Sequence, residues 1–368
     1  MFDDCLIMAG GSGTRLWPAS NSRLPKQFLP ASAKASFFSL AVERALSVTG
    51  NNGRVIVIAG KAHIPHVLAD VAGLSAGKKK RMLIIGEPVA KNTAPAIACA
   101  ISYSLLSGGG NMLVLTSDHI IKPLEAFKAD AKLAASFADR GKLVVFGVSP
   151  SRAETGYGYI ETGNAAGGGA RKVAAFHEKP DARTAKKYAA SKRFFWNSGM
   201  FAFSAEFMAG QFRGLAPKVF LPFEKLKVPK ADFFAVSDGV RVLDGWPELG
   251  GAYRKTESVS FDYAIVEKCA EAVMVRANFD WIDIGNWEEY AKVCATGGKS
   301  RVFGLSKDTC YVDSDIPVAL AGVEDLIVVI RSGKNGAPAT ALITGKGQTQ
   351  KVRDVVEEIK KTGNAELL

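Results

Sequence analysis

The chain has 368 residues, of which 48% are hydrophobic and 23% charged, a composition typical of a globular protein with one large and one small domain. Its first apolar run is short and has no basic flank, so neither a signal peptide nor a membrane span is expected. Five cysteines without CxxC spacing predict reduced thiols and a cytoplasmic protein. The net charge of +11 favours anionic partners.

The first thirty residues carry the clearest chemical pattern. An apolar run, Cys5–Ala9, predicts a buried strand, and it ends in a loop of Gly10, Gly11, Ser12 and Gly13. Glycine lets a ligand approach the main chain closely, and amide groups above a strand end suit phosphate. Arg15 can fork two hydrogen bonds to phosphate oxygens, and Lys26 adds a compact positive charge. We interpret the stretch as a triphosphate-binding loop.

Two common phosphate motifs are excluded at this loop. Leu16 stands where a GxGxxG pattern needs its third glycine, and no Gly-Lys-Ser/Thr follows for a Walker A motif.

From Cys5 to Val148, apolar runs alternate with helical patterns, which predicts an α/β fold with a Rossmann-like, mostly parallel sheet covered on both faces. Ligands of such sheets bind beyond the carboxyl ends of the strands. The further strands are expected at Arg54–Ala59, Met82–Ile85, Met112–Thr116 and Leu143–Val148, and the helices at Phe37–Val48, Ile64–Ala72, Thr93–Leu106 and Leu124–Asp139.

Acidic residues follow several of these strands. Glu87 comes after Met82–Ile85, and its carboxylate could accept from the paired N1–H and 2-amino donors of guanine. Asn92 or Thr93 is expected to cap the next helix. Asp118 follows Met112–Thr116, where a carboxylate could bind Mg²⁺ together with phosphate oxygens. Capping and ordinary surface roles remain open for these residues.

Beyond Pro150 the pattern becomes irregular. Glu154–Glu161 reads as a strand in which Gly158 permits close approach, and Gly163–Gly169 as a hairpin loop. Glu178 and Lys179 are adjacent, so both can face one ligand only if the chain bends there. Asn197 can donate to and accept from sugar hydroxyls.

Toward the C-terminus, Ser258–Glu267 is interpreted as a capped scaffold helix. Asp283 ends a further predicted strand and is the candidate partner of Asp118, with Asp280 as the weaker alternative. After a boundary between residues 296 and 297, short strands and a final helix predict a small C-terminal β domain. The predicted domains are 1–296 and 297–368.

These motifs resemble those of a known family. Gly11-Ser-Gly-Thr-Arg-Leu-Trp-Pro18 followed by Pro25-Lys-Gln-Phe28 is similar to the signature of the sugar-1-phosphate nucleotidyltransferases, and in particular of the guanylyltransferases that use mannose 1-phosphate. Glu87–Pro95, Phe176–Pro180 and Trp196–Phe201 resemble the family's base-binding and sugar-binding segments. The motifs occur in the family's order along nearly the whole chain.

The resemblance implies the reaction of GTP with α-D-mannose 1-phosphate to give GDP-mannose and pyrophosphate, with Mg²⁺ as cofactor. It implies that Asp118 and Asp283 bind the metal and that Lys179 holds the sugar phosphate. Glu178, Asn197 and Gly158 would line the sugar site. The residues implied to bind the nucleotide are Gly10–Thr14, Glu87, Asn92 and Thr93. Arg15 and Lys26 would hold the negatively charged triphosphate.

Three alternatives stay open from sequence. The chain could use another sugar 1-phosphate or base, or could be a non-catalytic nucleotide-sugar sensor. The third alternative is a nucleic-acid binder, which the lack of a stacking-aromatic motif beside Lys78–Arg81 disfavours. No nucleic-acid or membrane partner is therefore expected. Oligomeric state is not given, although the C-terminal β domain could serve as the interface of a homodimer.

Overall fold

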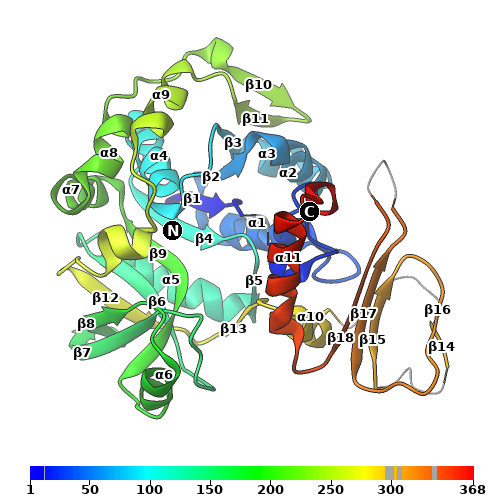
Figure 1. The fold of residues 1–368 in the computed structure, drawn as a ribbon. Helices are drawn as coiled ribbons and strands as arrows, with labels where there is room; N and C mark the ends of the chain where they lie inside the picture. Colours follow the sequence, from blue (N-terminus) through cyan, green and yellow to red (C-terminus); the bar gives the residue numbers. More distant parts are fainter. Residues whose placement is uncertain (12, 295–301, 305–308, 334–337) are drawn as a thin grey trace. The chain divides into compact units, whose positions relative to one another are not determined.

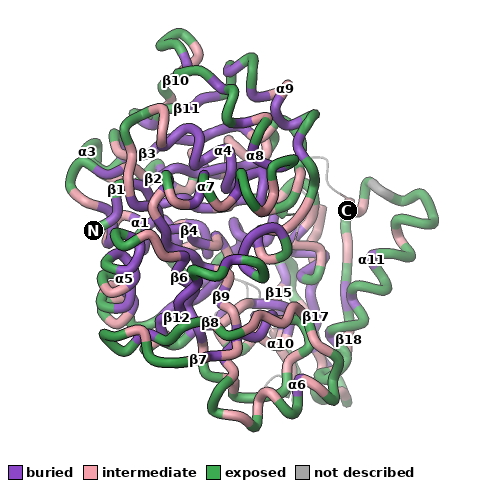
Figure 2. Tube along the Cα trace, turned by 90° about the vertical axis from the view of Figure 1, so that its left-hand side faces the viewer, coloured by how far each residue is buried: buried purple, intermediate pink, exposed green. Residues whose placement is uncertain are grey.

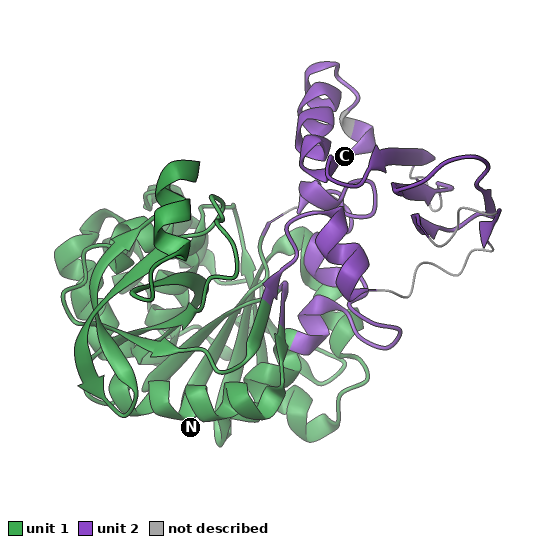
Figure 3. Ribbon diagram, turned by 90° about the horizontal axis from the view of Figure 1, so that it is seen from below, with its two compact units in different colours: residues 1–10, 41–117, 121–281 green, residues 11–40, 118–120, 282–368 purple. Residues whose placement is uncertain are grey.

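The computed structural model describes residues 1–368 except 12, 295–301, 305–308 and 334–337. The chain forms two compact units (Figure 3). Unit 1 comprises Met1–Gly10, Ala41–Ser117 and Ile121–Trp281, and unit 2 comprises Gly11–Leu40, Asp118–Ile120 and Ile282–Leu368. The predicted boundary at 296–297 lies outside the described residues. The units are also composed differently from the predicted domains, because two earlier segments group with the C-terminal part.

Unit 1 is built on a mixed sheet whose described strands follow the order β10-β11-β3-β2-β1-β4-β9-β6-β12-β8-β7 (Figure 1). The strands are β1 (Phe2–Met8), β2 (Thr49–Gly60), β3 (Met82–Glu87), β4 (Asn111–Thr116), β6 (Leu143–Val148), β7 (Tyr159–Gly167), β8 (Ala170–His177), β9 (Phe194–Ser204), β10 (Phe234–Ser237), β11 (Val240–Leu243) and β12 (Ala272–Arg276).

Parallel pairing runs without interruption from β11 to β4. In this part Met8 at the end of β1 pairs with Thr116 at the end of β4, and Gly60 of β2 pairs with Glu87 of β3. The carboxyl ends therefore meet at one edge, as the sequence predicts. Antiparallel pairing enters with β9, which lies between β4 and β6. The predicted α/β fold is confirmed, whereas the sheet is parallel only from β11 to β4 and in the pair β6–β12, and its other pairings are antiparallel.

Both faces of the sheet are covered. Cys5, Leu6 and Ile7 of β1 are successive residues that point to opposite faces, yet all three are fully buried. Figure 2 draws much of the central sheet in purple, the colour of buried residues. Helix α4 packs against β1 and β2, and α5 packs against β4, β6, β9 and β12. The helices of unit 1 are α2 (Ile64–Val71), α3 (Ala76–Lys80), α4 (Thr93–Leu106), α5 (Leu124–Ala138), α6 (Ala182–Ala189), α7 (Ala205–Leu215), α8 (Pro217–Glu224) and α9 (Pro247–Lys255), and α1 (Phe37–Val48) begins in unit 2.

The irregular middle of the chain differs from two expectations. Strand β7 begins only at Tyr159, so residues 154–158 form a loop in place of a strand. The expected loop Gly163–Gly169 is largely strand, because β7 continues to Gly167 and β8 resumes at Ala170. The glycines predict a break, but cross-strand pairing through Ala165 and Gly167 continues the hairpin almost to its tip.

Unit 2 joins short strands to two helices around an apolar core. Its described strands form a sheet in the order β15-β17-β18 and a second sheet of β14 and β16. Strands β5 and β13 also pair, and each contains residues of both units. These elements are β5 (His119–Lys122), β13 (Asp280–Asp283), α10 (Trp287–Val293), β14 (Val302–Phe303), β15 (Tyr311–Ser314), β16 (Val318–Ala319), β17 (Leu326–Arg331), β18 (Thr340–Gly345) and α11 (Val352–Lys361).

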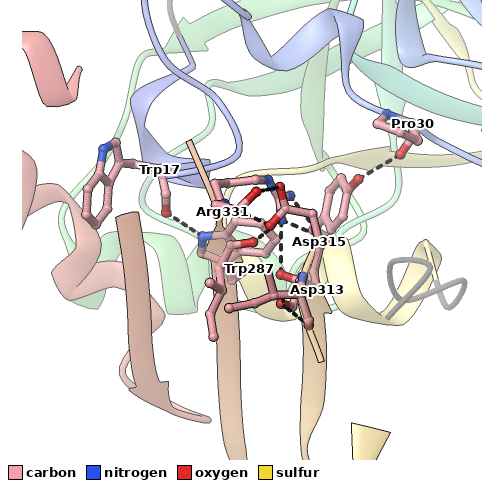
Figure 4. Close-up of polar contacts among 11 residues, drawn as sticks. Trp17, Pro30, Trp287, Asp313, Asp315 and Arg331 are labelled. Carbon is pink, nitrogen blue, oxygen red and sulfur yellow. Dashed lines mark hydrogen bonds and ion pairs between the residues drawn. The ribbon is translucent and has the colours of Figure 1, made fainter. Parts of the chain in front are cut away.

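Trp287 is the centre of this core. It is fully buried, its ring packs edge-on against Tyr290 at 5.3 Å, and its Nε1 donates to the carbonyl oxygen of Trp17 at 2.9 Å (Figure 4). The Tyr290 hydroxyl donates in turn to the Pro30 carbonyl at 2.9 Å. Helix α10 therefore fixes the segment that follows the glycine loop.

None of the helices in the described residues has the length and apolar character needed to cross a membrane. The five cysteines are free thiols, as predicted, and Cys5, Cys99 and Cys269 are buried.

Candidate active site

Unit 2 brings a lysine and two aspartates together from three distant segments. Lys26 Nζ lies 2.8 Å from Asp118 Oδ2 and 3.0 Å from Asp283 Oδ1. Lys26 belongs to the short 3₁₀ turn Lys26–Phe28, which is anchored by packing of Phe28 against Phe38. Asp118 precedes β5 and Asp283 ends β13. The two candidate metal ligands thus lie close together, and both bind one ammonium group.

The ammonium dominates the electrostatics of this cluster. Burial opposes ionisation of all three groups, but the pKa of Lys26 is raised and those of Asp118 and Asp283 are lowered, because each charge faces its opposite at hydrogen-bond distance. The imidazole of His119 adds Nε2 at 3.7 Å from Asp118 and 3.8 Å from Asp283. The sequence predicts that Lys26 contacts phosphate, whereas in the structure its ammonium group contacts the two aspartates.

The donor set suits a hard divalent cation. Carboxylate oxygens are the ligands that Mg²⁺ prefers, and it usually takes one or two of them together with phosphate oxygens and water. Asp118 and Asp283 already converge on a single positive group. A group of three or more His, Cys, Asp or Glu residues that could hold a metal ion is not found among the described residues. Asp280 is exposed at the start of β13.

The glycine loop is tightly built at one position. Gly13 has φ +61° and ψ +30°, and a Cβ placed there would lie 2.3 Å from the Cβ of Lys26. At Gly10 and Gly11 no described atom would lie within 4 Å of an added Cβ, so their main chain is open to a ligand. Ser12 lies outside the described residues. Thr14 and Arg15 open the following 3₁₀ turn, and Arg15 is exposed.

Replacing Gly13 by alanine should disturb the lysine–aspartate cluster. A left-handed conformation costs an L-residue about 1–2 kcal/mol, and the new methyl group must displace Lys26, so we expect a loss of about 1–3 kcal/mol in the free energy of unfolding. Urea titration measures it. Gly10→Ala is the control, because its added methyl meets open space. Equal stability of the two variants would contradict the close packing of Gly13 on Lys26.

In unit 1, the predicted base-binding segment connects β3 to α4. Asn92 caps α4, because its Oδ1 accepts from the Thr93 amide at 2.9 Å. Its φ of +72° with ψ near 180° is a conformation that almost only glycine adopts. Thr93 Oγ1 accepts from the Phe261 amide at 2.8 Å. The segment is therefore strained at Asn92 and held in place by a distant part of the chain.

Glu87 ends β3 with a buried carboxyl oxygen. Its Oε1 is buried without a well-aligned donor in the part of the chain that the structure describes, and the buried Tyr253 hydroxyl lies close to the carboxyl group. Burial raises the pKa of Glu87 to about 7, with the Tyr253 hydroxyl opposing part of the shift. An acceptor buried at this cost is ready for a ligand that carries donors.

The bend required at Glu178 and Lys179 is present. Lys179 itself has φ +46°, and its Nζ lies 2.6 Å from Glu178 Oε1, so both side chains lie on one side of the chain. Glu178 is the more buried partner, with 10% of its side chain exposed against 59% for Lys179. Gly158 leaves room for the carboxylate, because an added Cβ would lie 2.7 Å from Glu178 Oε2.

Asn197 joins this group through β9. Its amide nitrogen in the main chain donates to the Gly158 carbonyl at 2.8 Å, and its side-chain Nδ2 donates to Asp262 Oδ1 at 2.9 Å. Unit 1 therefore gathers Gly158, Glu178, Lys179 and Asn197, the residues predicted to line a sugar-phosphate site, and adds Asp262.

Sequence reasoning missed Asp262 and Tyr253. Asp262 lies in the segment interpreted as scaffold, which is a short π-helix, Asp262–Val266. A π-helical turn inside a helix often marks a functional site, but the amino-acid pattern does not reveal it. A carboxylate within an otherwise apolar run, Phe261 to Val266, was the available signal. Tyr253 lies on α9 without any local pattern that would relate it to Glu87.

The sheet, the glycine loop and the paired aspartates at a strand end define a nucleotide-transferring enzyme fold. Residues 4–298 match the sequence profile of the nucleotidyl transferase family, and the chain belongs to that family. It is therefore a nucleotidyltransferase.

Several named relatives indicate which nucleotidyltransferases the chain is similar to. The chain is 36% identical to the xanthan biosynthesis protein XanB of Xanthomonas campestris pv. campestris (strain B100), with 98% of this chain and 74% of that protein covered. It is 35% identical to the mannose-1-phosphate guanylyltransferase of Salmonella montevideo, with 96% and 73% covered. A solved structure, mannose-1-phosphate geranyltransferase from Thermus thermophilus, is 28% identical with a TM-score of 0.78 and covers 97% of this chain and 99% of its own.

Proposed function

We propose that the chain transfers GMP from GTP to α-D-mannose 1-phosphate, giving GDP-mannose and pyrophosphate. The substrates follow from the relatives named mannose-1-phosphate guanylyltransferase, which are 32–35% identical over nearly the whole chain. The observation that carries the chemistry is that Asp118 and Asp283 both contact the ammonium group of Lys26. Such a pair can provide two carboxylate ligands for a metal ion that triphosphate oxygens also hold.

The nucleophile is an oxygen of the sugar phosphate. The second pKa of a phosphomonoester is about 6, so the phosphate is mostly dianionic at pH 7 and no general base is required. The main obstacle is repulsion between two polyanions that must meet in line. Positioning and charge neutralisation therefore provide the catalysis. Mg²⁺, when bound by Asp118 and Asp283, supplies part of that neutralisation.

The remaining roles are assigned to the chain's own side chains. Arg15 is exposed beside the loop that carries Gly13 and can hold the departing pyrophosphate. Lys26 fixes the two aspartates. Lys179 projects from the surface and can hold the sugar phosphate, while Glu178 and Asn197 orient the sugar.

Pyrophosphate release tests this proposal. Purified protein is assayed with Mg²⁺, each of GTP, ATP, UTP and dTTP, and either mannose 1-phosphate or glucose 1-phosphate. We expect release with GTP that is fastest with mannose 1-phosphate and that stops when EDTA removes the metal. Release with another pair would contradict the assigned base or sugar. Folded protein that binds GTP but releases nothing with any pair would support the sensor alternative.

Glu87 is proposed to read guanine through N1–H and the 2-amino group. The bound form must be the carboxylate, whereas free Glu87 has a pKa of about 7. GTP affinity should therefore fall as the pH drops below 7 and level off above it. Glu87→Gln should remove this pH dependence and lower the preference for GTP over ATP about 10- to 100-fold, because the amide NH₂ faces guanine donors. Nucleotide titration from pH 5.5 to 8.5 measures both effects.

The same variant should gain stability. A carboxyl whose pKa is raised by folding lowers the free energy of unfolding as the pH rises from about 4.5, the pKa in the unfolded chain, to about 7, the pKa in the folded protein. Glu87→Gln should therefore be more stable than wild type by about 2–3 kcal/mol at pH 8 and equal to it below pH 4.5. The control is Glu248→Gln, an exposed change on α9. A stability loss at pH 8 would contradict the assigned environment of Glu87.

A cytoplasmic location is proposed as well, since all five cysteines are free thiols. A homodimer remains a proposal for the C-terminal β strands, to be tested by light scattering.

A further inference from the structure

Asp262 occupies a fixed position beside the proposed sugar residues. It is the first residue of the π-helix Asp262–Val266. The preceding turn is held by two hydroxyl acceptors, because the Phe261 amide donates to Thr93 Oγ1 at 2.8 Å and the Tyr263 amide donates to Ser260 Oγ at 3.3 Å. The carboxylate is therefore placed by the same threonine that follows the cap of α4.

The Asn197 amide is oriented by two contacts. Its Oδ1 accepts from the Gly199 amide at 3.2 Å, and its Nδ2 donates to Asp262 Oδ1 at 2.9 Å. These contacts assign the oxygen and the nitrogen of the Asn197 amide, and the second N–H of Nδ2 stays available for a ligand oxygen. Within the described residues, the side-chain donor to Asp262 is Asn197 and it occupies Oδ1, so Oδ2 can receive a donor from a ligand.

The carboxylate is held there at an energetic cost. Burial, followed by the neighbouring Glu178 charge, raises the pKa of Asp262 to about 6, while Lys179 and the Asn197 hydrogen bond oppose the rise. A residue that served only to orient Asn197 could do so as a neutral asparagine. Two adjacent carboxylates also repel a phosphate, which leaves the phosphate to Lys179 and directs both acceptors to uncharged donors.

We propose that Asp262 is a further substrate-binding residue, whose carboxylate accepts a hydrogen bond from one hydroxyl of the sugar while it fixes the Asn197 amide. The inference rests on the proposed function, because it concerns the sugar half of that reaction. Glu178 and Asp262 then each receive a hydroxyl, and their spacing selects among sugars that differ in hydroxyl position.

Steady-state kinetics of Asp262→Asn, Asp262→Ala and wild type test this role. A hydrogen bond to a charged acceptor is worth about a 10- to 100-fold change. We expect the KM for mannose 1-phosphate to rise by that factor in Asp262→Asn, with the KM for GTP within about twofold of wild type. Glu267→Gln changes an exposed carboxylate at the C-terminal end of the same helix; it is the matched control and should keep both constants. An unchanged KM for mannose 1-phosphate in Asp262→Asn would overturn the proposal.

Deoxy analogues separate binding from mere positioning. With 2-, 3-, 4- and 6-deoxymannose 1-phosphate, one analogue should show equal kcat/KM in wild type and Asp262→Ala, because it lacks the hydroxyl that Asp262 receives. An equal loss for every analogue would show that Asp262 acts only through Asn197 and would overturn the proposal.

A pH series gives an independent readout. Asp262 faces the charged groups of Glu178 and Lys179, and it becomes neutral below pH 6. The ratio of kcat/KM between wild type and Asp262→Asn should therefore shrink toward 1 at pH 5.5, while titration of the substrate phosphate cancels in the ratio. A ratio that stays constant from pH 5.5 to 8 contradicts an anionic acceptor at Asp262.

Calorimetric titration with mannose 1-phosphate distinguishes failure of the Asp262 proposal from failure of the proposed function. Wild type that binds the sugar phosphate more tightly than Asp262→Asn, but releases no pyrophosphate, would support Asp262 and contradict the proposed function. Wild type that releases pyrophosphate as proposed, but binds the sugar phosphate no more tightly than Asp262→Asn, would contradict Asp262 alone.

Discussion

Replacing Lys26 by methionine should cost about 2–4 kcal/mol of unfolding free energy at pH 7. The change keeps most of the side-chain volume and removes the positive charge that lies 2.8 Å and 3.0 Å from two carboxylates. Loss of one partner from a buried ion pair costs about 3–5 kcal/mol, and the partial exposure of Asp118 reduces this figure. Pyrophosphate release should fall at least about 100-fold, because the aspartates lose the group that fixes them.

The pH dependence identifies the cause. The pKa values of Asp118 and Asp283 are lowered in the folded protein, so their contribution to stability is present above pH 4 and is lost as the pH falls. The difference between Lys26→Met and wild type should therefore shrink below pH 4. Lys128→Met, which removes only an exposed pair with Glu125, is the control and should change stability by less than about 1 kcal/mol. A difference that is the same at pH 3 and pH 7 would point to packing instead.

Trp287→Ala should destabilise unit 2 by about 3–5 kcal/mol, the usual cost of deleting a buried aromatic side chain. The ring is fully buried, contacts Tyr290, and donates the hydrogen bond to the Trp17 carbonyl shown in Figure 4. Trp287→Phe keeps most of the packing and should lose only about 1–2 kcal/mol, from the unpaired carbonyl. Urea unfolding of the three proteins measures both terms.

Amide exchange locates the effect of this substitution. We expect faster exchange at residues 14–17 in both Trp287 variants, because α10 fixes that segment through the Trp17 carbonyl. Phe303→Ala is the control, since that ring belongs to the same unit and is 54% exposed. Exchange at residues 14–17 that is no faster than in the control would contradict the anchoring role of Trp287.

Local patterns were sufficient to predict most of the sheet and helices. Helix α4 is found at the predicted residues, Thr93–Leu106, because its start carries a capping asparagine and most of its residues are apolar. The strand Leu143–Val148 is likewise found as predicted. Both elements are determined by residues that are neighbours in sequence.

Contacts between distant segments could not be predicted in this way. The partners of Lys26 lie 92 and 257 positions away, so the sequence shows a lysine near a glycine loop and gives no sign that aspartates bind it. Asp262 receives its hydrogen bond from a residue 65 positions earlier. The composition of unit 2, which unites residues 11–40 and 118–120 with the C-terminal part, has the same origin. Such pairings depend on the fold as a whole.

The left-handed backbone at Lys179 has a consequence for how this site can change over evolutionary time. Because one peptide unit carries both the acid and the base, Glu178 and Lys179 cannot be moved independently. An insertion between them would separate the charges, and any residue at position 179 must tolerate the same conformation, which most side chains resist. We therefore expect the dipeptide to vary as a unit, and new sugar preferences of the proposed site to arise from neighbours such as positions 197 and 262.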